Sequence, residues 1–326
     1  MDHQHLTAQL EALLRETYGL WGPGWVTFNW RNYTYDHVQR VRRLATELAR
    51  RQGGDVQVVE LAALLHDLTK PFDGEYQTGA DGKRIVDAQG FWHNETRLPE
   101  RHNDITRRYL ALGLSGSLHN MSGAVLAREL LSTMGVGSMT VEQVARAIEE
   151  HLIPPDDASL ESHCLYDADT IDANIGLPAF VRNIYINLHF YDSRRADDEA
   201  PIAETLARDP ARFLTPYIHE NLPRWARGKR QDFVDKLTTS AARDLASARL
   251  DRLEHLFAEL AEELPHVTPG ADHSRIDLLL HYMRCGDDPS IWDETERLAH
   301  EWRTHDTPLP TCDMIEALRQ EMLGRC

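Results

Sequence analysis

Residues 60–71 read ELAALLHDLTKP. The stretch is rich in Ala and Leu and has no Gly or Pro before Pro71, so it predicts a helix that ends just beyond His66 and Asp67. A helix that is apolar on nearly all sides is buried, which places these two polar side chains at the inner end of a core helix. A buried carboxylate needs compensating partners, and a metal ion would satisfy both residues at once. An adjacent His-Asp pair is weak evidence by itself, so the residues spaced around it decide whether a metal site is present.

The composition is that of an ordinary globular protein. At 326 residues the chain can form one large domain or two smaller ones, each with its own core. The net charge of −17 argues against a nucleic-acid groove or an anionic membrane surface as the main partner. It leaves room for a small phosphorylated substrate, because bound divalent ions can create a local cationic pocket inside an acidic protein.

The cysteines are scattered and contain no C-x-x-C pair: Cys164, Cys285, Cys312 and Cys326. This pattern favours reduced thiols over a disulfide framework or a zinc knuckle. The first residues lack the basic and apolar regions of a signal peptide, and no stretch approaches the roughly 18 consecutive apolar residues of a membrane-spanning helix. We therefore expect a soluble cytoplasmic protein.

Helical hydrophobic patterns run along most of the chain and predict an all-α fold. Besides the core helix, they predict helices at about 6–18, 35–51, 119–131, 140–152 and 178–192, and then at 202–208, 210–221, 229–264, 272–284, 289–305 and 311–323. Between them, residues 72–118 are broken by glycines and aromatics. We interpret this segment as an insertion with a short hairpin near 83–86, of the kind that often covers an active site.

Six imidazole and carboxylate residues lie on or at the ends of the predicted helices: His37, His66, Asp67, His119, His151 and Asp169. Such ligands without thiolate suit zinc, iron or manganese, and the carboxylates also accept harder ions. One ion needs about four protein ligands, whereas two ions that share Asp67 would use all six. Each histidine also has an ordinary explanation, as when His151 at a helix C-terminus interacts with the helix dipole.

The order H, then HD, then D resembles the HD superfamily of metal-dependent phosphohydrolases over about residues 32–192. The resemblance implies an HD-domain helical bundle in which His37, His66, Asp67 and Asp169 bind a first metal ion. Asp169 is preferred to Asp167 because the run ADTID at 168–172 matches the family segment A-D-x-[LI]-D.

The dinuclear branch of that family adds two histidines, which match His119 and His151. The first of them opens a helix in an H-x-x-[SG]-[AG] context, and the second closes the next helix. Two features depart from the pattern. The long segment before His119 leaves His93 or His102 as alternatives to it, and Glu150 stands where cyclic-dinucleotide-degrading members have a second histidine.

The resemblance implies hydrolysis of a phosphoester or phosphoanhydride by a metal-activated hydroxide. Two divalent ions would be the cofactors, with Fe, Mn, Mg, Co and Zn all open. Asp67 and Lys70 are the predicted catalytic residues, because Lys70 matches the lysine of H-D-x-x-K that lies near the substrate. Lys70, Asp172 and Arg182 are the predicted substrate-binding residues for a small phosphorylated compound, with a nucleotide favoured.

Two other functions are compatible with the same residues. A smaller branch of HD proteins consists of mixed-valent di-iron oxygenases, which cleave C–C or C–P bonds with O₂, and an inositol-oxidising member carries the same H-D-x-x-K run. A binding or regulatory protein with a degenerate site is the third interpretation. The spacing of the candidate ligands does not distinguish the oxygenase from a phosphohydrolase.

The expected domain organisation has three parts. Residues 1–31 form an N-terminal helix and an aromatic turn, residues 32–198 form the HD domain with its insertion at about 72–118, and residues 199–326 form a C-terminal helical region. We expect this last region to pack onto the catalytic bundle or to mediate contacts in a homodimer.

Overall fold

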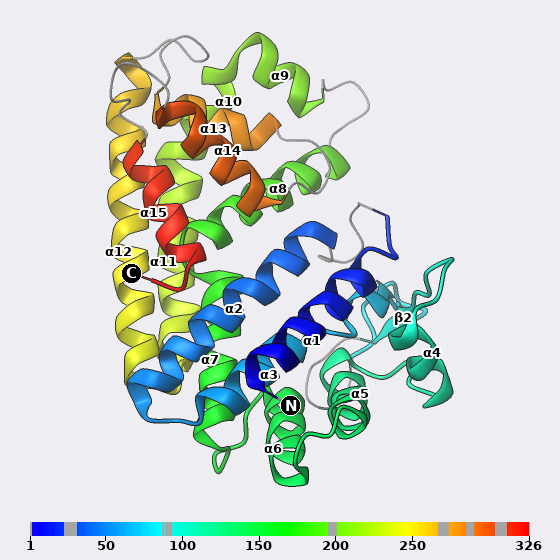
Figure 1. Ribbon diagram of the computed structural model, residues 1–326. Coiled ribbons are helices and arrows are strands. Elements are labelled where there is room, and N and C mark those ends of the chain that lie inside the picture. The colour runs from blue at the N-terminus through cyan, green and yellow to red at the C-terminus, as the bar shows by residue number, and fades with distance from the viewer. Residues whose placement is uncertain are drawn as a thin grey trace. The chain divides into compact units, whose positions relative to one another are not determined.

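Helices form most of the chain, and the all-α prediction is confirmed (Figure 1). The computed structural model describes residues 2–22, 31–86, 88, 93–194, 201–266, 274–284, 290–303 and 312–325. The chain divides into two compact units, Met1–Asp169 and Thr170–Cys326. The domain boundary expected near residues 198–199 and most of the expected aromatic turn lie outside the described residues, and the three-part organisation stays a prediction.

The first unit is a helical bundle built around the apolar stretch of residues 61–65. It contains α1 (His3–Tyr18), α2 (Arg31–Gln52), α3 (Val56–Leu65), α4 (Asp104–Ala111), α5 (His119–Thr133), α6 (Ser138–Glu150) and α7 (Leu160–Asn174), the last of which continues into the second unit. Helix α3 packs against α1, α2 and α6, and α5 packs against α4 and α6. Helix α3 therefore lies in the interior of the bundle.

Helix α3 begins and ends where its sequence dictates. The carboxylate of Asp55 caps it by accepting from the backbone N–H groups of Gln57 and Val58. The side chains of residues 61–65 are almost completely buried, as expected for a helix that is apolar on nearly all sides. His66 is its C-terminal cap, and a 3₁₀ turn, η1 (Lys70–Phe72), follows with Pro71 inside it.

The insertion between α3 and α5 contains a small antiparallel sheet of β1 (Asp73–Tyr76) and β2 (Asn94–Thr96), the one sheet among the described residues. Asp73 lies opposite Thr96. Gly74 is required here, because a Cβ atom at this position would lie 2.7 Å from the carbonyl oxygen of Glu95. The hairpin predicted near residues 83–86 is present, since the Ile85 N–H donates to the Gln77 carbonyl, but the main strands lie on either side of it.

The second unit continues with short and long helices: α8 (Leu177–Arg194), α9 (Ile202–Arg208), α10 (Pro210–Pro216), the π turn η2 (Tyr217–Asn221), α11 (Leu222–Phe233), η3 (Val234–Lys236), α12 (Ser240–Glu263), η4 (Leu264–His266), α13 (Arg275–Arg284), α14 (Ile291–Arg303) and α15 (Cys312–Met322). Within it, α8 packs against α13 and α15, and α11 packs against α12. None of the helices in the described ranges has the length and hydropathy to span a bilayer.

The single helix predicted over residues 229–264 is wrong. The chain leaves the helix after Phe233, makes the 3₁₀ turn η3, and starts again at Ser240. Thr239 is extended and its hydroxyl accepts from the Ala242 N–H, so it caps α12. This local hydrogen bond competes with a continuous helix, although the stretch contains neither Gly nor Pro.

Candidate metal centre

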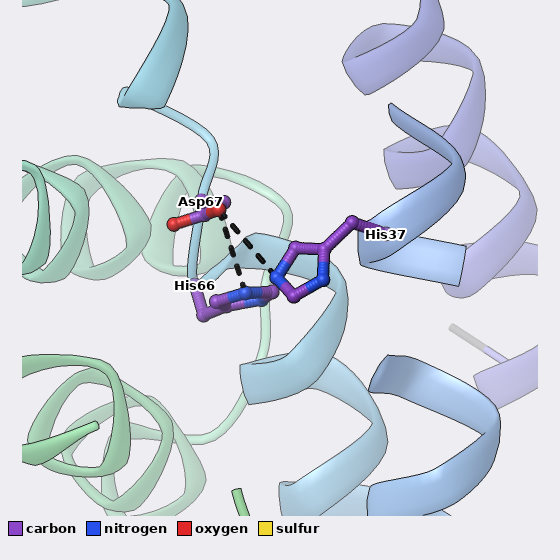
Figure 2. Close-up of side chains that lie close together, drawn as sticks. All are labelled: His37, His66 and Asp67. Carbon is purple, nitrogen blue, oxygen red and sulfur yellow. Dashed lines mark ion pairs between the residues drawn. The ribbon is translucent and has the colours of Figure 1, made fainter. Parts of the chain in front are cut away.

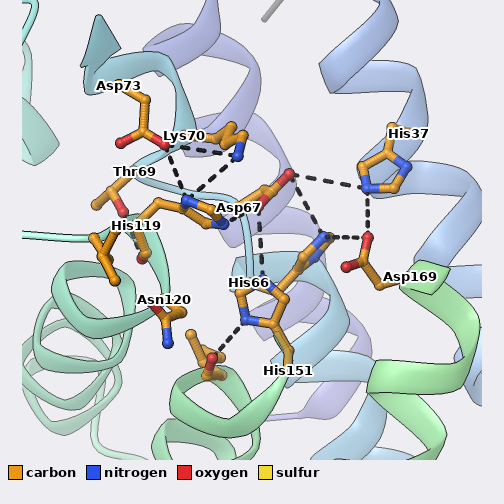
Figure 3. A network of polar contacts seen from close by, with 12 residues as sticks. His37, His66, Asp67, Thr69, Lys70, Asp73, His119, Asn120, His151 and Asp169 are labelled. Atoms are coloured by element: carbon orange, nitrogen blue, oxygen red, sulfur yellow. Dashed lines mark hydrogen bonds and ion pairs between the residues drawn. The ribbon is translucent and has the colours of Figure 1, made fainter. Parts of the chain in front are cut away.

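The structure brings all six candidate residues together in the first unit, around the carboxylate of Asp67 (Figure 3). His37 comes from α2, which begins at Arg31, so His37 lies in its second turn. His66 ends α3, His119 begins α5, and His151 caps the C-terminus of α6. Asp169 lies on α7, and its Oδ1 is 3.0 Å from His37 Nε2.

The two oxygens of Asp67 face different pairs of histidines. Its Oδ2 lies 3.9 Å from His37 Nε2 and 3.7 Å from His66 Nε2 (Figure 2). Its Oδ1 lies 3.6 Å from His119 Nε2 and 4.0 Å from His151 Nε2. The first donor set is therefore His37, His66 and Asp67, with Asp169 beside it, and the second donor set is Asp67, His119 and His151.

The separations within each set suit a cation. Two ligand atoms bound to one ion at about 2.1 Å can lie at most about 4.2 Å apart. The nitrogen-to-oxygen distances around Asp67 fall within this limit and exceed the length of a good hydrogen bond. The donor atoms are thus as far apart as the ligands of one bound ion would be.

Two of the histidines carry unpaired nitrogen atoms in the protein interior. His66 and His151 are only 0% and 1% exposed, and the Nε2 atom of each has no hydrogen-bond partner among the described residues. Their Nδ1 atoms lie 2.7 and 2.6 Å from the carbonyl oxygens of Ala63 and Ile148, each in the preceding helical turn. A carbonyl can only accept, so the hydrogen must be on Nδ1, and Nε2 presents a bare lone pair to the Asp67 carboxylate. This arrangement fits metal ligation, since a buried polar atom without a partner is otherwise costly.

The electrostatics keep these groups in the protonation states that ligation needs. Burial would raise the pKa of Asp67, but the nearby His66, His119 and Lys70 hold that pKa well below its usual range. Burial, together with His66, lowers the pKa of His151 to about 3. At neutral pH the carboxylate is therefore ionised and the imidazole neutral.

Packing around residues 66–69 holds this part of the site in place. The Thr69 hydroxyl lies 2.9 Å from the His119 carbonyl and 2.9 Å from the Ser122 hydroxyl. Gly123 of α5 also faces this segment, since a Cβ atom added there would lie in van der Waals contact with the His66 carbonyl oxygen, at 3.4 Å. On another side, the buried Tyr18 hydroxyl donates to the Asp67 carbonyl at 2.8 Å, so α1 also supports the centre.

Lys70 lies at the edge of the second donor set, next to a carboxylate that the sequence interpretation missed. Its Nζ atom is 3.3 Å from His119 Nδ1 and 3.6 Å from Asp73 Oδ2. The same Asp73 oxygen is 2.9 Å from His119 Nδ1. Asp73 opens β1 in the insertion, where no helical pattern pointed to it. In the sequence, the only indication that Asp73 belongs to the centre was that it follows Lys70 by three residues.

The remaining candidates lie elsewhere. His93 and His102 are both exposed and belong to neither donor set, which leaves His119 as the histidine that meets Asp67. Asp172 on α7 and Arg182 on α8 lie in the second unit, and their part in substrate binding stays a prediction.

Comparisons with known proteins match part of the chain to a family. Residues 34–174 match the family model of the HD domain. Among solved structures, YpgQ of Bacillus subtilis in complex with ADP is similar with a TM-score of 0.40 at 18% identity, over 82% of this chain and 99% of that one. A predicted HD superfamily hydrolase from an uncultured Thermotogales bacterium is similar with a TM-score of 0.37 at 24% identity, over 69% of this chain and 99% of that one.

No curated protein matches the sequence at a significant level. The matched residues 34–174 include all six candidate ligands and Lys70. The helical bundle, the H, HD and D order, and the convergence of these residues around Asp67 agree with that match. The chain therefore contains an HD domain within residues 34–174.

Proposed function

We propose that the protein is a metal-dependent phosphohydrolase that cleaves a phosphoester or phosphoanhydride bond in a small substrate, with nucleotides as the favoured class. The match of residues 34–174 to the HD domain supports hydrolysis as the reaction class. The observation that carries the proposal is the sharing of Asp67 between two nitrogen and oxygen donor sets, two of whose buried Nε2 atoms have no hydrogen-bond partner among the described residues.

The ligand assignments follow from the two donor sets. His37, His66, Asp67 and Asp169 would hold one divalent ion, and Asp67, His119 and His151 would hold a second. Bound divalent ions at such a centre lower the pKa of water and neutralise charge on a phosphoryl group. Nitrogen and oxygen donors without thiolate suit Fe, Mn, Co or Zn, and the carboxylates also suit Mg.

The charge balance of the centre supports an anionic substrate. Asp67, Asp73 and Asp169 are carboxylates, and Lys70 is a cation that contacts the cluster. These side chains together leave two net negative charges, which two divalent ions would convert to a net positive centre. Such a centre attracts a phosphoryl group even though the protein as a whole is acidic.

Lys70 is more exposed than the candidate metal ligands. Its ammonium group has three donors, and its side chain is 29% exposed, which is more than any of the six candidate ligands. We propose that Lys70 binds a phosphoryl oxygen and stabilises the charge that develops there during cleavage. Asp172 and Arg182 remain proposed substrate-binding residues.

The test begins with the metal content of protein purified with and without oxygen. We expect about two divalent ions per chain and, after reloading of chelated protein with Mn, Mg or Co, release of phosphate from one member of a phosphate-ester and nucleotide panel. ADP, the ligand in the YpgQ complex, belongs in that panel. Substrate cleavage must not require O₂.

Two other sets of results would indicate a different function. Copurified iron with a coupled di-iron EPR signal on partial reduction, together with O₂ consumption, would identify an oxygenase. Protein without bound metal, whose thermal unfolding does not respond to chelation, would identify a binding or regulatory protein. The three functions therefore give different results in the same set of measurements.

A further inference from the structure

We infer that Asp73 is a positioning residue that selects the tautomer of His119 and thereby prepares the second donor set for its ion. This inference rests on the proposed function, because it concerns one of the two proposed metal sites. Asp73 belongs to the insertion and is 46 residues from His119 in the sequence, yet its Oδ2 lies 2.9 Å from His119 Nδ1 (Figure 3). Both side chains are nearly buried.

The identity of the hydrogen-bond partner determines which nitrogen of His119 carries the hydrogen. An ionised carboxylate can only accept, so the contact with Asp73 requires the hydrogen on Nδ1. The other nitrogen, Nε2, then has a free lone pair on the side that faces Asp67 Oδ1 at 3.6 Å. A carboxylate behind a ligating imidazole also makes the imidazole a better donor.

Lys70 would select the opposite tautomer if Asp73 were absent. Its ammonium Nζ lies 3.3 Å from the same Nδ1 atom and can only donate. A hydrogen bond from Lys70 to Nδ1 would place the imidazole hydrogen on Nε2, where it would block ligation. Asp73 prevents this because it occupies Nδ1 and, at 3.6 Å, also offers Lys70 an acceptor.

His119 differs in this respect from His66 and from His151, the other histidine of the second donor set. In His66 and His151 the Nδ1 hydrogen is fixed by a backbone carbonyl of the preceding helical turn, so no side chain is needed. His119 is the first residue of its helix, so no preceding turn supplies such a carbonyl. A side chain must do this instead, and the backbone of β1 and β2 holds Asp73 in position.

The test is a titration of metal-free protein with Zn²⁺ or Mn²⁺, which measures the affinity of each site. In Asp73→Asn we expect one of the two sites to weaken by about 10-fold to 100-fold, while the other keeps its affinity. Asp73→Glu, which keeps the carboxylate, should restore part of the loss. The matched control is Glu95→Gln, which removes an exposed carboxylate from the paired strand β2 and should change neither site.

A double variant separates positioning from a general effect on structure. Replacing Lys70 by Met in the Asp73→Asn background removes the donor that would hold the wrong tautomer. We therefore expect Lys70→Met/Asp73→Asn to bind the second ion more tightly than Asp73→Asn alone, which simple damage to the fold would not produce. Thermal unfolding and circular dichroism of each variant show whether the bundle is intact.

The outcomes distinguish this inference from the proposed function. Wild-type protein that binds no divalent ion contradicts both. Two unchanged sites in Asp73→Asn, or an equal loss at both sites, contradict the role of Asp73 and leave the proposed function standing. Selective loss with recovery in Asp73→Glu and in the double variant supports the role.

Discussion

His66 and Asp67, neighbours in the chain, direct Nε2 and Oδ2 to positions 3.7 Å apart in the protein interior. Helix α3 ends at Leu65, with His66 as its cap. The first donor set therefore lies at the C-terminal end of the core helix, where the polar pair follows the buried apolar residues.

Replacing Asp67 by Ala should abolish metal retention and phosphohydrolase activity together, with a loss of activity of at least about 100-fold. Asp67 is the one residue present in both donor sets, so its loss affects both proposed ions. Elemental analysis and phosphate release from the purified variant measure the two effects. Asp156→Ala removes an exposed carboxylate and serves as the control. Full turnover by Asp67→Ala would contradict the proposed mechanism.

Removal of bound metal should lower the thermal stability of the first unit. An ion present at 100 times its dissociation constant stabilises the folded state by about 2.7 kcal/mol, which corresponds to roughly 5–10 °C in the unfolding midpoint of a domain of this size. Calorimetry with and without a chelator measures the shift. The Asp67→Ala variant should show no such shift, and a chelator effect of equal size in that variant would indicate a different binding site.

The stability of the metal-free protein should fall with pH below about 6.5 because of His151. In the unfolded chain this histidine has its ordinary pKa of 6.5, whereas burial lowers the pKa in the folded state to about 3. Between these values the unfolded state binds more protons, so acid favours unfolding. Denaturant titrations at several pH values should give a shallower dependence for His151→Gln. His102→Gln, which changes an exposed loop histidine, should keep the wild-type dependence.

Replacing Lys70 by Met should weaken substrate binding and catalysis, each by roughly 10-fold, while leaving two bound ions. The ammonium group lies beside the cluster but is no member of either donor set. Steady-state kinetics give KM and kcat, and elemental analysis gives the metal content. A variant with wild-type kinetics would remove Lys70 from the proposed reaction.

Gly176→Ala should destabilise the second unit by roughly 2–4 kcal/mol. Gly176 has φ of +104°, and an added Cβ would lie 2.3 Å from Glu321 Oε2 and 3.0 Å from Arg249 Cδ. Gly228→Ala is the matched control, because Gly228 lies in α11 with open space around it and should gain about 0.5–1 kcal/mol. Thermal unfolding distinguishes them, and equal stability of the two variants would contradict this account.

The sequence predicts those parts of the centre that depend on helix ends. His66, His119 and His151 lie where an apolar or amphipathic pattern starts or stops, and such ends are local features. Asp73 could not be recognised in this way. Its contact with His119 depends on strand pairing in a segment without helical periodicity, and on the approach of residues far apart in the chain.

The break before α12 shows a different limit. Residues 234–239 interrupt a stretch whose hydrophobic spacing continues across it, and Thr239 as a capping residue was the overlooked signal. A threonine within a helical hydrophobic pattern is compatible with the interior of a helix as well as with a cap. Tertiary packing decides which of the two it forms, and this packing could not be predicted from the sequence alone.

The placement of Asp73 at the first residue of β1 has a consequence for engineering the insertion. Chimaeras that exchange the tip between residues 77 and 93 for a shorter turn would retain the strand pair and the carboxylate at its base. Deletion of the whole segment would remove them together. The Asp73 carboxylate could then be kept or removed independently of the rest of the segment.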